Sequence, residues 1–228
     1  MTADDFLAGQ TLLIDKPLQW SSFQAVNKIK YVLKSKFGLK KLKIGHAGTL
    51  DPLATGLLVI CTGKSTKIIA NIQADYKEYT GTLRVGATTP SYDMETRENQ
   101  TFDYLHITPD LVNEKLAEFT GRIMQKPPVF SAIKKDGKRL YEHARAGEEV
   151  EVNPRPVDVY EFEITRFELP EIDFRIKCGK GTYIRSIAHD FGAALGSGAY
   201  LTALRRTRIG AYDVKDAVSP LDFENSLT

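Results

Sequence analysis

The stretch from Gly45 to Gly63 reads GHAGTLDPLATGLLVICTG and divides into two parts. The first part, up to Gly56, is rich in turn-forming residues and contains one histidine and one carboxylate. The second part, from Gly56 onward, is a continuous apolar run of strand length between two glycines. Such a run is typical of an interior strand, although periodicity alone leaves a buried helical turn open. We therefore expect a turn that presents Asp51, followed by a strand in the core.

The segment before this stretch predicts a strand and a helix. Residues 12–15 read as a short buried strand, and a turn follows at Lys16-Pro17. A helix then begins, with Ser21 or Ser22 as its N-cap. The apolar residues of this helix recur at helical spacing and form one stripe, which comprises Phe23, Val26, Ile29, Leu33 and Phe37.

The rest of the chain predicts further strands and helices. Residues 79–91 carry β-forming residues that end in turn residues, which indicates a strand, and a helix opens at Thr108 and stops at Gly121. Residues 158–167 and 172–178 are typical of an antiparallel pair, and a second amphipathic helix follows, with apolar residues at Ile184, Ile187, Phe191 and Leu195. Because no regular βαβ period appears, we expect an α+β fold with a mixed, largely antiparallel sheet flanked by helices.

The composition indicates a soluble, folded protein. Of the 228 residues, 42% are hydrophobic and 26% are charged, which is ordinary globular usage. No apolar run approaches the roughly 20 residues that a membrane-spanning helix needs, and the N-terminus is acidic without a hydrophobic segment. We therefore expect a cytoplasmic protein. Cys61 and Cys178 lie in apolar or strand-like segments, so we expect both to be small buried hydrophobes.

The positive charge of the chain is concentrated in one segment. The net charge is only +2, but residues 28–43 contain seven lysines and no acid. Such a run is often a solvated helix face, and from the charges alone that interpretation stays open. Because the run leads directly into the unusual segment around Asp51, a polyanionic substrate could be bound there.

Several kinds of chemistry find no support in the sequence. The glycines at Gly56 and Gly63 have the wrong spacing for a phosphate-binding loop, and no pair of histidines or cysteines has metal-ligand spacing. No G-x-S-x-G elbow marks a serine hydrolase. We therefore expect neither a cofactor nor a metal. Asp51 is then either a turn residue or a nucleophile, because carboxylates form covalent intermediates at sugar or electrophilic ring carbons.

Residues 45–67, GHAGTLDPLATGLLVICTGKSTK, resemble the signature of the TruB family of tRNA pseudouridine synthases. Other segments resemble the family in the family's order, namely LLIDKPLQWSS, KEYTGTLRVGATTPSYD, KPPVFSAIKKDGKRLYEHARAG, KGTYIRSIAHDFG and LTALRRTRIG. The resemblance spans Leu12 to Gly210. It implies the pseudouridine synthase fold and the conversion of uridine 55 in the T-arm of tRNA to pseudouridine, an isomerisation that requires no cofactor.

The resemblance assigns a catalytic role to three residues. Asp51 aligns with the family's catalytic aspartate, and Tyr79 aligns with a tyrosine that stacks on the uracil and helps to remove its C5 proton. Arg185 aligns with an arginine that pairs with the aspartate. A neighbouring cation favours the ionised form of a carboxylate, so Arg185 would keep Asp51 nucleophilic. Whether the carboxylate adds to the uracil ring or attacks the sugar stays open.

The resemblance also implies residues that bind the substrate. Because a base within a folded loop must be flipped out before it can react, the motif's histidine, His46, would occupy the space that the base vacates. Tyr183 and Leu204 fall at positions that line the uridine pocket. We also expect phosphate contacts from Lys16, Lys64 and Lys67.

The extent of the resemblance predicts how the chain is organised. We expect a single catalytic domain over residues 1–228, within which residues 126–157 are a candidate RNA-binding insertion. Bacterial members commonly continue into an RNA-binding domain of the PUA type, but 18 residues (228 − 210) follow Gly210, too few for such a domain. The expected partner is the T-arm stem-loop of tRNA, bound by a monomer without an obligate protein partner. Two alternatives are a guide-RNA-dependent synthase of the dyskerin type and an RNA-binding or tRNA-folding chaperone.

Overall fold

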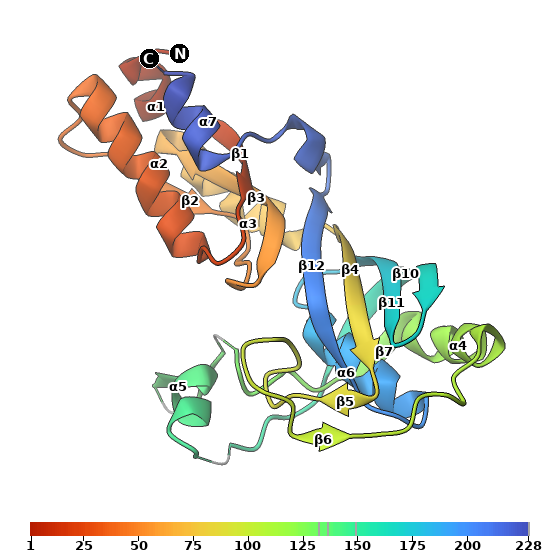
Figure 1. The fold of residues 1–228 in the computed structure, drawn as a ribbon. Helices are drawn as coiled ribbons and strands as arrows, with labels where there is room; N and C mark the ends of the chain where they lie inside the picture. Colours follow the sequence, from red (N-terminus) through yellow and green to blue (C-terminus); the bar gives the residue numbers. More distant parts are fainter. Residues whose placement is uncertain (132, 136, 149, 228) are drawn as a thin grey trace. The chain divides into compact units, whose positions relative to one another are not determined.

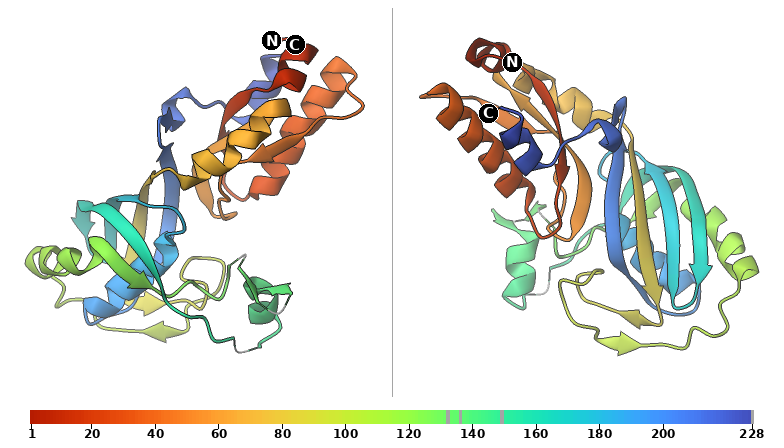
Figure 2. Two further views of the ribbon diagram at one scale, coloured as in Figure 1. Left: turned by 180° about the vertical axis from the view of Figure 1, so that it is seen from behind. Right: turned by 45° about the horizontal axis from the view of Figure 1, so that its top comes forward.

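The computed structural model describes residues 1–131, 133–135, 137–148 and 150–227, which form two compact units (Figures 1 and 2). Unit 1 comprises Met1–Thr80 and Leu204–Thr228, and unit 2 comprises Gly81–Ala203. Two strands, β4 (Lys77–Val85) and β12 (Ala199–Ile209), contribute residues to both units because the boundaries fall within them.

Unit 1 is built on a small mixed sheet with β3 (Ala54–Thr62) at its centre. β1 (Thr11–Lys16) lies antiparallel to β3 on one side, and β12 lies parallel to β3 on the other. Two short strands extend this sheet: β2 (Ile44–His46) pairs with β3, and β13 (Tyr212–Asp213) pairs with β12. The strand expected over residues 12–15 is therefore confirmed, and so is the interior strand of the opening stretch.

β3 is apolar without interruption because both of its faces are covered. Leu58 and Ile60 belong to a core cluster that includes the buried face of α2 (Ser22–Phe37), whereas Leu57, Val59 and Cys61 belong to a second cluster with Ile72 and Ile209. A strand buried on both faces shows no alternation of polar and apolar residues, which explains the continuous run in the sequence. Cys61 and Cys178 are both buried, as expected.

α2 begins and ends with clear caps. Ser21 is the N-cap, its hydroxyl accepts a hydrogen bond from the N–H of Gln24, and Gly38 ends the helix in the left-handed conformation. The predicted stripe is wrong at its first member, because Phe23 is 71% exposed. The buried face instead includes Ala25 and Val32. Its residues are Ser22, Ala25, Val26, Ile29, Val32 and Leu33. These two residues widen that face on the side of the helix away from Phe23.

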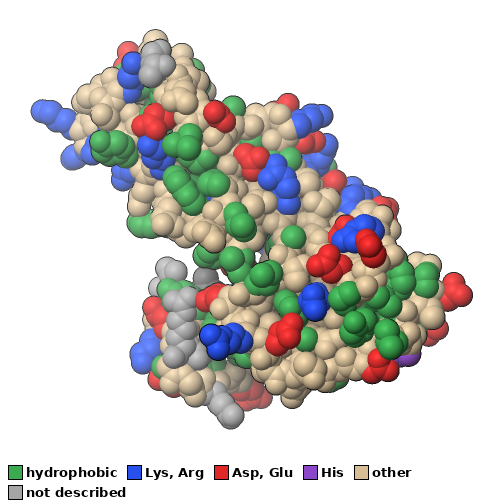
Figure 3. Space-filling model, viewed as in Figure 1, with side chains coloured by type: hydrophobic (Ala, Val, Ile, Leu, Met, Phe, Trp, Pro, Cys, Tyr) green, Lys and Arg blue, Asp and Glu red, His purple; other side chains and the backbone are tan. Residues whose placement is uncertain are grey.

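Short helices complete unit 1. They are α1 (Ala3–Ala8), η1 (Gly63–Ile68), α3 (Ile69–Ala74), η3 (Val214–Asp216) and α7 (Pro220–Asn225). The Phe6 ring of α1 and Phe223 of α7 lie in the same cluster as the buried face of α2. Figure 3 shows Lys and Arg side chains over the region of α2, where the sequence concentrates its lysines.

Unit 2 contains a sheet in the order β12-β4-β11-β10-β7. β10 (Arg155–Glu168) lies antiparallel to both β11 (Glu171–Cys178) and β7 (Gly121–Gln125), which confirms the expected antiparallel pair. α6 (Ile184–Ala194) packs on this sheet: its Phe191 ring lies 5.2 Å from Phe162 of β10, measured between ring centroids. α4 (Pro109–Leu116) begins at the Thr108 cap and runs into η2 (Ala117–Phe119).

The remaining elements of unit 2 are short. The expected strand over residues 79–91 ends earlier, at Val85, because Gly86 has a φ of +93° and the chain turns there. β5 (Ala87–Thr88) then pairs with β6 (Gln100–Thr101). The candidate insertion over residues 126–157 contains β8 (Lys134–Lys135), β9 (Lys138–Arg139) and α5 (Leu140–Arg145), while its residues 132, 136 and 149 lie outside the described residues.

The expected fold class is confirmed. The pairings of β1, β2, β7, β10, β11 and β13 are antiparallel, the pairing of β3 with β12 is parallel, and helices flank the strands. Within the described part of the chain, no helix has both the length and the apolar character that crossing a membrane would require.

Candidate active site

Asp51 lies in the loop that joins β2 to β3. These strands are antiparallel neighbours, but His46, the last residue of β2, lies opposite Ile60, so the loop must run back along β3 to reach its first residue, Ala54. The N–H of Ala54 donates to the carbonyl oxygen of Asp51 at 3.1 Å and closes a tight turn over Pro52. The side chain of Asp51 is half-buried. The predicted turn is therefore confirmed, and it presents a carboxylate that retains access to solvent.

A buried serine fixes the residue that precedes Asp51. The hydroxyl of Ser22 accepts a hydrogen bond from the N–H of Leu50 at 2.8 Å and donates one to the carbonyl oxygen of Leu50 at 3.1 Å. Ser22 is 2% exposed and Leu50 is 4% exposed, so water has little access to these groups. On the other side of Asp51, the N–H of Gln19 donates to the carbonyl oxygen of Pro52 at 2.8 Å. The turn is thus fixed at both ends.

A buried arginine of β12 binds the backbone on both sides of the turn. Arg206 is 1% exposed, and it donates from Nε to the carbonyl oxygen of Leu57 at 2.8 Å and from one terminal nitrogen to that of Gly48 at 3.0 Å. Gly56 lies opposite Arg206 with a φ of +100°, and a Cβ there would lie 2.3 Å from the Arg206 carbonyl oxygen. The motif therefore requires glycine at this position, because a side chain would separate β3 from β12.

Lys16 differs from the expectation. Its side chain is fully buried, and Nζ donates to the carbonyl oxygens of Pro17 and Trp20 at 2.9 and 2.5 Å. Burial lowers the pKa of Lys16 to about 8, while the charge of Asp51 raises it and the charge of Arg206 lowers it. The structure therefore does not support the expected phosphate contact by Lys16. The residue instead supplies a buried cation whose charge acts on Asp51.

His46 is half-buried at the end of β2. Burial lowers the pKa of its imidazole, and the charge of Arg206 lowers it further, whereas a hydrogen bond with the backbone of Gly48 raises it. Among the described residues, Nδ1 has no hydrogen-bond partner. The neutral ring is therefore favoured at pH 7.

Tyr79 and Leu204 come from neighbouring strands of the same unit. Leu204 on β12 lies opposite Ala54, the residue whose N–H closes the Asp51 turn. β4, which carries the buried Tyr79, is the next strand beyond β12. Unit 1 thus presents the three residues from neighbouring elements: Asp51 from the turn that leads into β3, Leu204 from β12 and Tyr79 from β4.

The remaining lysines of the prediction are on the surface. Lys64 and Lys67 are both exposed on η1, which follows β3 directly. In the lysine-rich segment 28–43, Lys28 pairs with Glu224 of α7 at 2.6 Å. An exposed lysine on a short helix can reach a phosphate without rearrangement of the core.

Arg185 lies in the first turn of α6 in unit 2 and is 4% exposed. Its terminal nitrogens donate to the carbonyl oxygens of Ser91 at 3.0 Å and Phe130 at 2.8 Å. Its Nε lies 3.7 Å from a carboxylate oxygen of Asp93. A buried guanidinium with several acceptors has a fixed direction. The expected pair between Arg185 and Asp51 joins residues of different units and stays a prediction.

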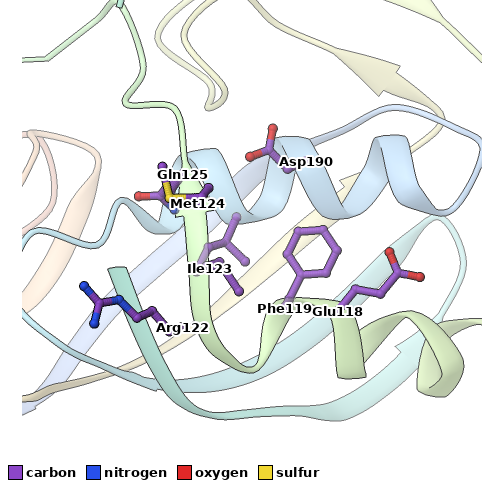
Figure 4. Close-up of a pocket in the computed structure, with 8 residues that line it drawn as sticks. Glu118, Phe119, Arg122, Ile123, Met124, Gln125 and Asp190 are labelled. Carbon is purple, nitrogen blue, oxygen red and sulfur yellow. The ribbon is translucent and has the colours of Figure 1, made fainter. Parts of the chain in front are cut away.

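Tyr183 directly precedes α6 and is fixed through its backbone. Its N–H donates to the side-chain oxygen of Gln125 at 2.8 Å, and its carbonyl oxygen accepts from the side-chain nitrogen of Gln125 at 3.0 Å. The guanidinium of Arg155 lies 5.4 Å from the centre of the Tyr183 ring. Gln125 and Asp190 also line a pocket of about 400 Å³ next to α6 (Figure 4), where burial raises the pKa of Asp190 to about 6.

The sequence did not identify the residues that fix this geometry. Ser22, Gln125, Arg206 and Asp93 are buried polar residues whose partners lie far along the chain. The signal that could have found Arg206 is its position among the arginines of LTALRRTRIG, a segment that otherwise reads as a strand. Among the described residues, no group of three or more His, Cys, Asp or Glu side chains is arranged to bind a metal ion.

Family models match nearly the whole chain. The N-terminal domain of TruB family pseudouridylate synthases matches residues 34–184, and the C-terminal domain of tRNA pseudouridylate synthase B matches residues 185–228. A protein of Flavobacterium johnsoniae named tRNA pseudouridine synthase B is 65% identical over 228 residues, covering all of both chains. A protein of the same name from Phocaeicola vulgatus is 53% identical over 96% of this chain and 93% of its own.

Solved structures share the fold. A chain in the crystal structure of a Cbf5–Nop10–Gar1 complex matches with a TM-score of 0.71 and 28% identity over 96% of this chain. A chain of the archaeal box H/ACA sRNP Nop10–Cbf5 complex matches with a TM-score of 0.69 and 26% identity over 97% of this chain. This chain spans 54% of each of those chains, about half of their length. On the family models and the 65% identity, the chain belongs to the TruB family of pseudouridylate synthases and is an isomerase.

Proposed function

We propose that this pseudouridine synthase acts on uridine 55 in the T-arm of tRNA. In the reaction the bond between N1 of uracil and C1′ of the sugar breaks, a bond between C5 and C1′ forms, C5 loses a proton and N1 gains one. The nucleotide therefore keeps its atoms, and the reaction uses no external oxidant, reductant or group donor. The relatives' shared name, tRNA pseudouridine synthase B, supports the substrate class.

Asp51 is the proposed nucleophile, and the way its turn is fixed carries the proposal. Three separate side chains or backbone groups, from Ser22, Gln19 and Arg206, bind the carbonyl and amide groups around a single half-buried carboxylate. An isolated turn residue would not need such support, whereas a nucleophile must be positioned within about 0.5 Å to react efficiently. The buried charge of Lys16 favours the ionised form of this carboxylate.

The other residues act around the flipped nucleotide. We propose that Tyr79 stacks on the uracil and assists removal of the C5 proton, and that Arg185 pairs with Asp51. The neutral ring of His46 suits a residue that fills the space left by the base. Tyr183 and Leu204 would line the uridine pocket. The fixed backbone of Tyr183 supports the first of these roles, and the position of Leu204 beside the Asp51 turn supports the other.

Binding of the T-arm would use exposed basic residues. Lys64 and Lys67 are exposed, and the segment 28–43 adds seven lysines without an acid. These charges would bind phosphates and make the affinity depend on salt. We further propose that the chain acts in the cytoplasm as a monomer, without a cofactor or an obligate protein partner.

The test is a pseudouridine assay on a T-arm stem-loop with purified protein. Wild type should convert the uridine, and Asp51→Asn should not, because an amide cannot act as the nucleophile. Asp51→Glu is the matched control for charge: it keeps the carboxylate but displaces it, so turnover should fall strongly while binding persists. Product from Asp51→Asn at the wild-type rate would disprove the role of Asp51.

The same assay separates the two alternatives. Conversion that requires added guide RNA and partner proteins would favour a guide-RNA-dependent synthase of the dyskerin type. Tight T-arm binding without conversion by wild type would favour an RNA-binding or tRNA-folding module. Refolding of tRNA that survives Asp51→Asn would show that folding and isomerisation are separate activities of one protein.

A further inference from the structure

Tyr92 has a backbone conformation that its side chain disfavours. Its φ is +64°, in the left-handed region, where a Cβ lies too close to the carbonyl oxygen. Glycine and asparagine adopt this region readily, but a bulky aromatic residue rarely does. Such strain persists only where the surrounding contacts over-determine the backbone, and it often marks a functional site. The contacts that hold Tyr92 in this conformation are therefore a candidate functional feature.

Two backbone hydrogen bonds and one ring contact maintain this conformation. The N–H of Tyr92 donates to the carbonyl oxygen of Thr89 at 3.1 Å, and its carbonyl oxygen accepts from the N–H of Leu201 at 3.0 Å. The ring of Tyr92 stacks on the imidazole of His189, with centroids 3.9 Å apart and an angle of 14° between the planes. This nearly parallel stack is the side-chain contact that ties the strained residue to α6.

The residues on either side of Tyr92 bind Arg185. Ser91 accepts from Arg185 through its carbonyl oxygen at 3.0 Å, and the Asp93 carboxylate lies 3.7 Å from Nε. His189 follows Arg185 by four residues on α6, so both side chains project from one face of the helix. The loop 91–93 and this face of α6 therefore meet twice, once at the guanidinium and once at the ring stack.

The Tyr92–His189 stack has little electrostatic character at neutral pH. Burial lowers the pKa of His189, and burial together with the charge of Asp190 raises the pKa of Tyr92. Both rings are therefore uncharged at pH 7. Nδ1 of His189 has no hydrogen-bond partner among the described residues, so the ring contact is the interaction that the structure shows for this imidazole.

We propose that Tyr92 and His189 are positioning residues for Arg185. Their stack clamps the loop 91–93 onto α6 in its strained conformation, and the clamped loop directs the guanidinium through Ser91 and Asp93. The inference rests on the proposed role of Arg185 in the reaction. It predicts that loss of either ring leaves the substrate site intact but loosens the contacts of the guanidinium with Ser91 and Asp93, while its hydrogen bond to the carbonyl oxygen of Phe130 remains.

The test compares variants that remove a ring with variants that keep one. Tyr92→Ala and His189→Ala should lower kcat on the T-arm stem-loop by about 10- to 100-fold, with KM within about twofold, because small displacements of a catalytic group have costs of this size. Tyr92→Phe and His189→Phe keep a planar ring and should stay within about threefold of wild type. The double alanine variant should be no worse than the worse single one, because both remove the same contact.

Glycine at position 92 separates positioning from stability. Tyr92→Gly adopts positive φ without strain, so it should have a higher Tm than Tyr92→Ala, yet lose the same turnover. The control is His106→Ala: His106 bonds the carbonyl oxygen of Leu195 at the end of α6, away from the loop, and its loss should leave kcat unchanged. Turnover that follows Tm across these variants, or a raised KM with unchanged kcat, would overturn the inference.

A second readout needs no substrate. In protein labelled with ¹⁵N-arginine, the Nε–H signal of Arg185, identified by its loss in Arg185→Lys, should exchange slowly with water in wild type and in Tyr92→Phe. It should exchange faster in Tyr92→Ala and His189→Ala. Unchanged exchange in the alanine variants would refute the positioning role. An inactive wild type with the expected exchange pattern would refute the proposed function alone.

Discussion

Replacing Ser22 with alanine tests how the structure fixes Asp51. The Ser22 hydroxyl makes two hydrogen bonds with the backbone of Leu50, at 2.8 and 3.1 Å, and both residues are buried. Ser22→Ala leaves the Leu50 N–H without that acceptor, and an unsatisfied buried donor costs about 1–3 kcal/mol. We expect the free energy of unfolding to fall by about 2 kcal/mol. The backbone that carries Asp51 also loses one of its anchors.

The neighbouring serine provides a matched control. Ser21 caps the same helix through the N–H of Gln24, at 3.1 Å, whereas the hydrogen bonds to Leu50 come from Ser22. Ser21→Ala should therefore cost about 1 kcal/mol, the usual value of an N-cap, and leave the Asp51 turn in place. The two variants differ by one position in the sequence and remove the same hydroxyl group, but they act on different parts of the structure.

The assays are urea unfolding and steady-state turnover of a T-arm stem-loop. Ser22→Ala should lower kcat by about 10- to 100-fold at a temperature where it is still folded, because displacement of a nucleophile has a cost of this size. Ser21→Ala should keep kcat within about twofold of wild type. Wild-type turnover by Ser22→Ala, or an equal loss of turnover in both variants, would refute the idea that this hydroxyl positions Asp51.

Three further predictions follow from single contacts. The pKa of Lys16 is about 8 in the folded protein and 10.5 ordinarily, so between these pH values the unfolded chain binds more protons than the folded one. The free energy of unfolding should therefore rise with pH in this range, by at most about 3 kcal/mol. Urea unfolding of Lys16→Met from pH 7 to 10.5 should lack this rise. Gly56→Ala should prevent folding to a soluble protein, because the new Cβ would lie 2.3 Å from the carbonyl oxygen of Arg206. Gly38→Ala is the control: its Cβ would have no neighbour within 4 Å, so the variant should express normally and unfold at a slightly lower Tm. Replacing both Lys64 and Lys67 with alanine should reduce the slope of log affinity against log salt by about 1–2, and an unchanged slope would remove them from the RNA interface.

Local patterns in the sequence predicted most elements for clear physical reasons. The uninterrupted run of β3 reflects a strand covered on both faces, and the spacing of Ile184, Ile187 and Phe191 reflects the single buried face of α6. The prediction was wrong at Phe23, because periodicity identifies a helix but does not fix the centre of its buried face. Ala25 and Val32 move that centre, and their small or ordinary apolar side chains give no distinctive signal.

The support of the candidate site could not be predicted in the same way. Asp51 was identified because its motif is a continuous segment, whereas Ser22 and Arg206 reach it from positions 28 residues or more away along the chain. Which buried polar group meets which backbone carbonyl depends on the tertiary pairing of β3 with β12. The expectation for Lys16 failed for the same reason, since a lysine after a strand reads as exposed until its Nζ is seen among the carbonyl oxygens of Pro17 and Trp20.

The central claim is that this chain converts uridine 55 of tRNA through Asp51. The most direct measurement is pseudouridine mapping of cellular tRNA in a strain without the gene, complemented with wild type or with Asp51→Asn expressed at equal levels. We predict that pseudouridine at position 55 is absent without the gene, restored by wild type and not restored by Asp51→Asn. Full modification at that position without the gene, or with Asp51→Asn as the sole copy, would contradict the account.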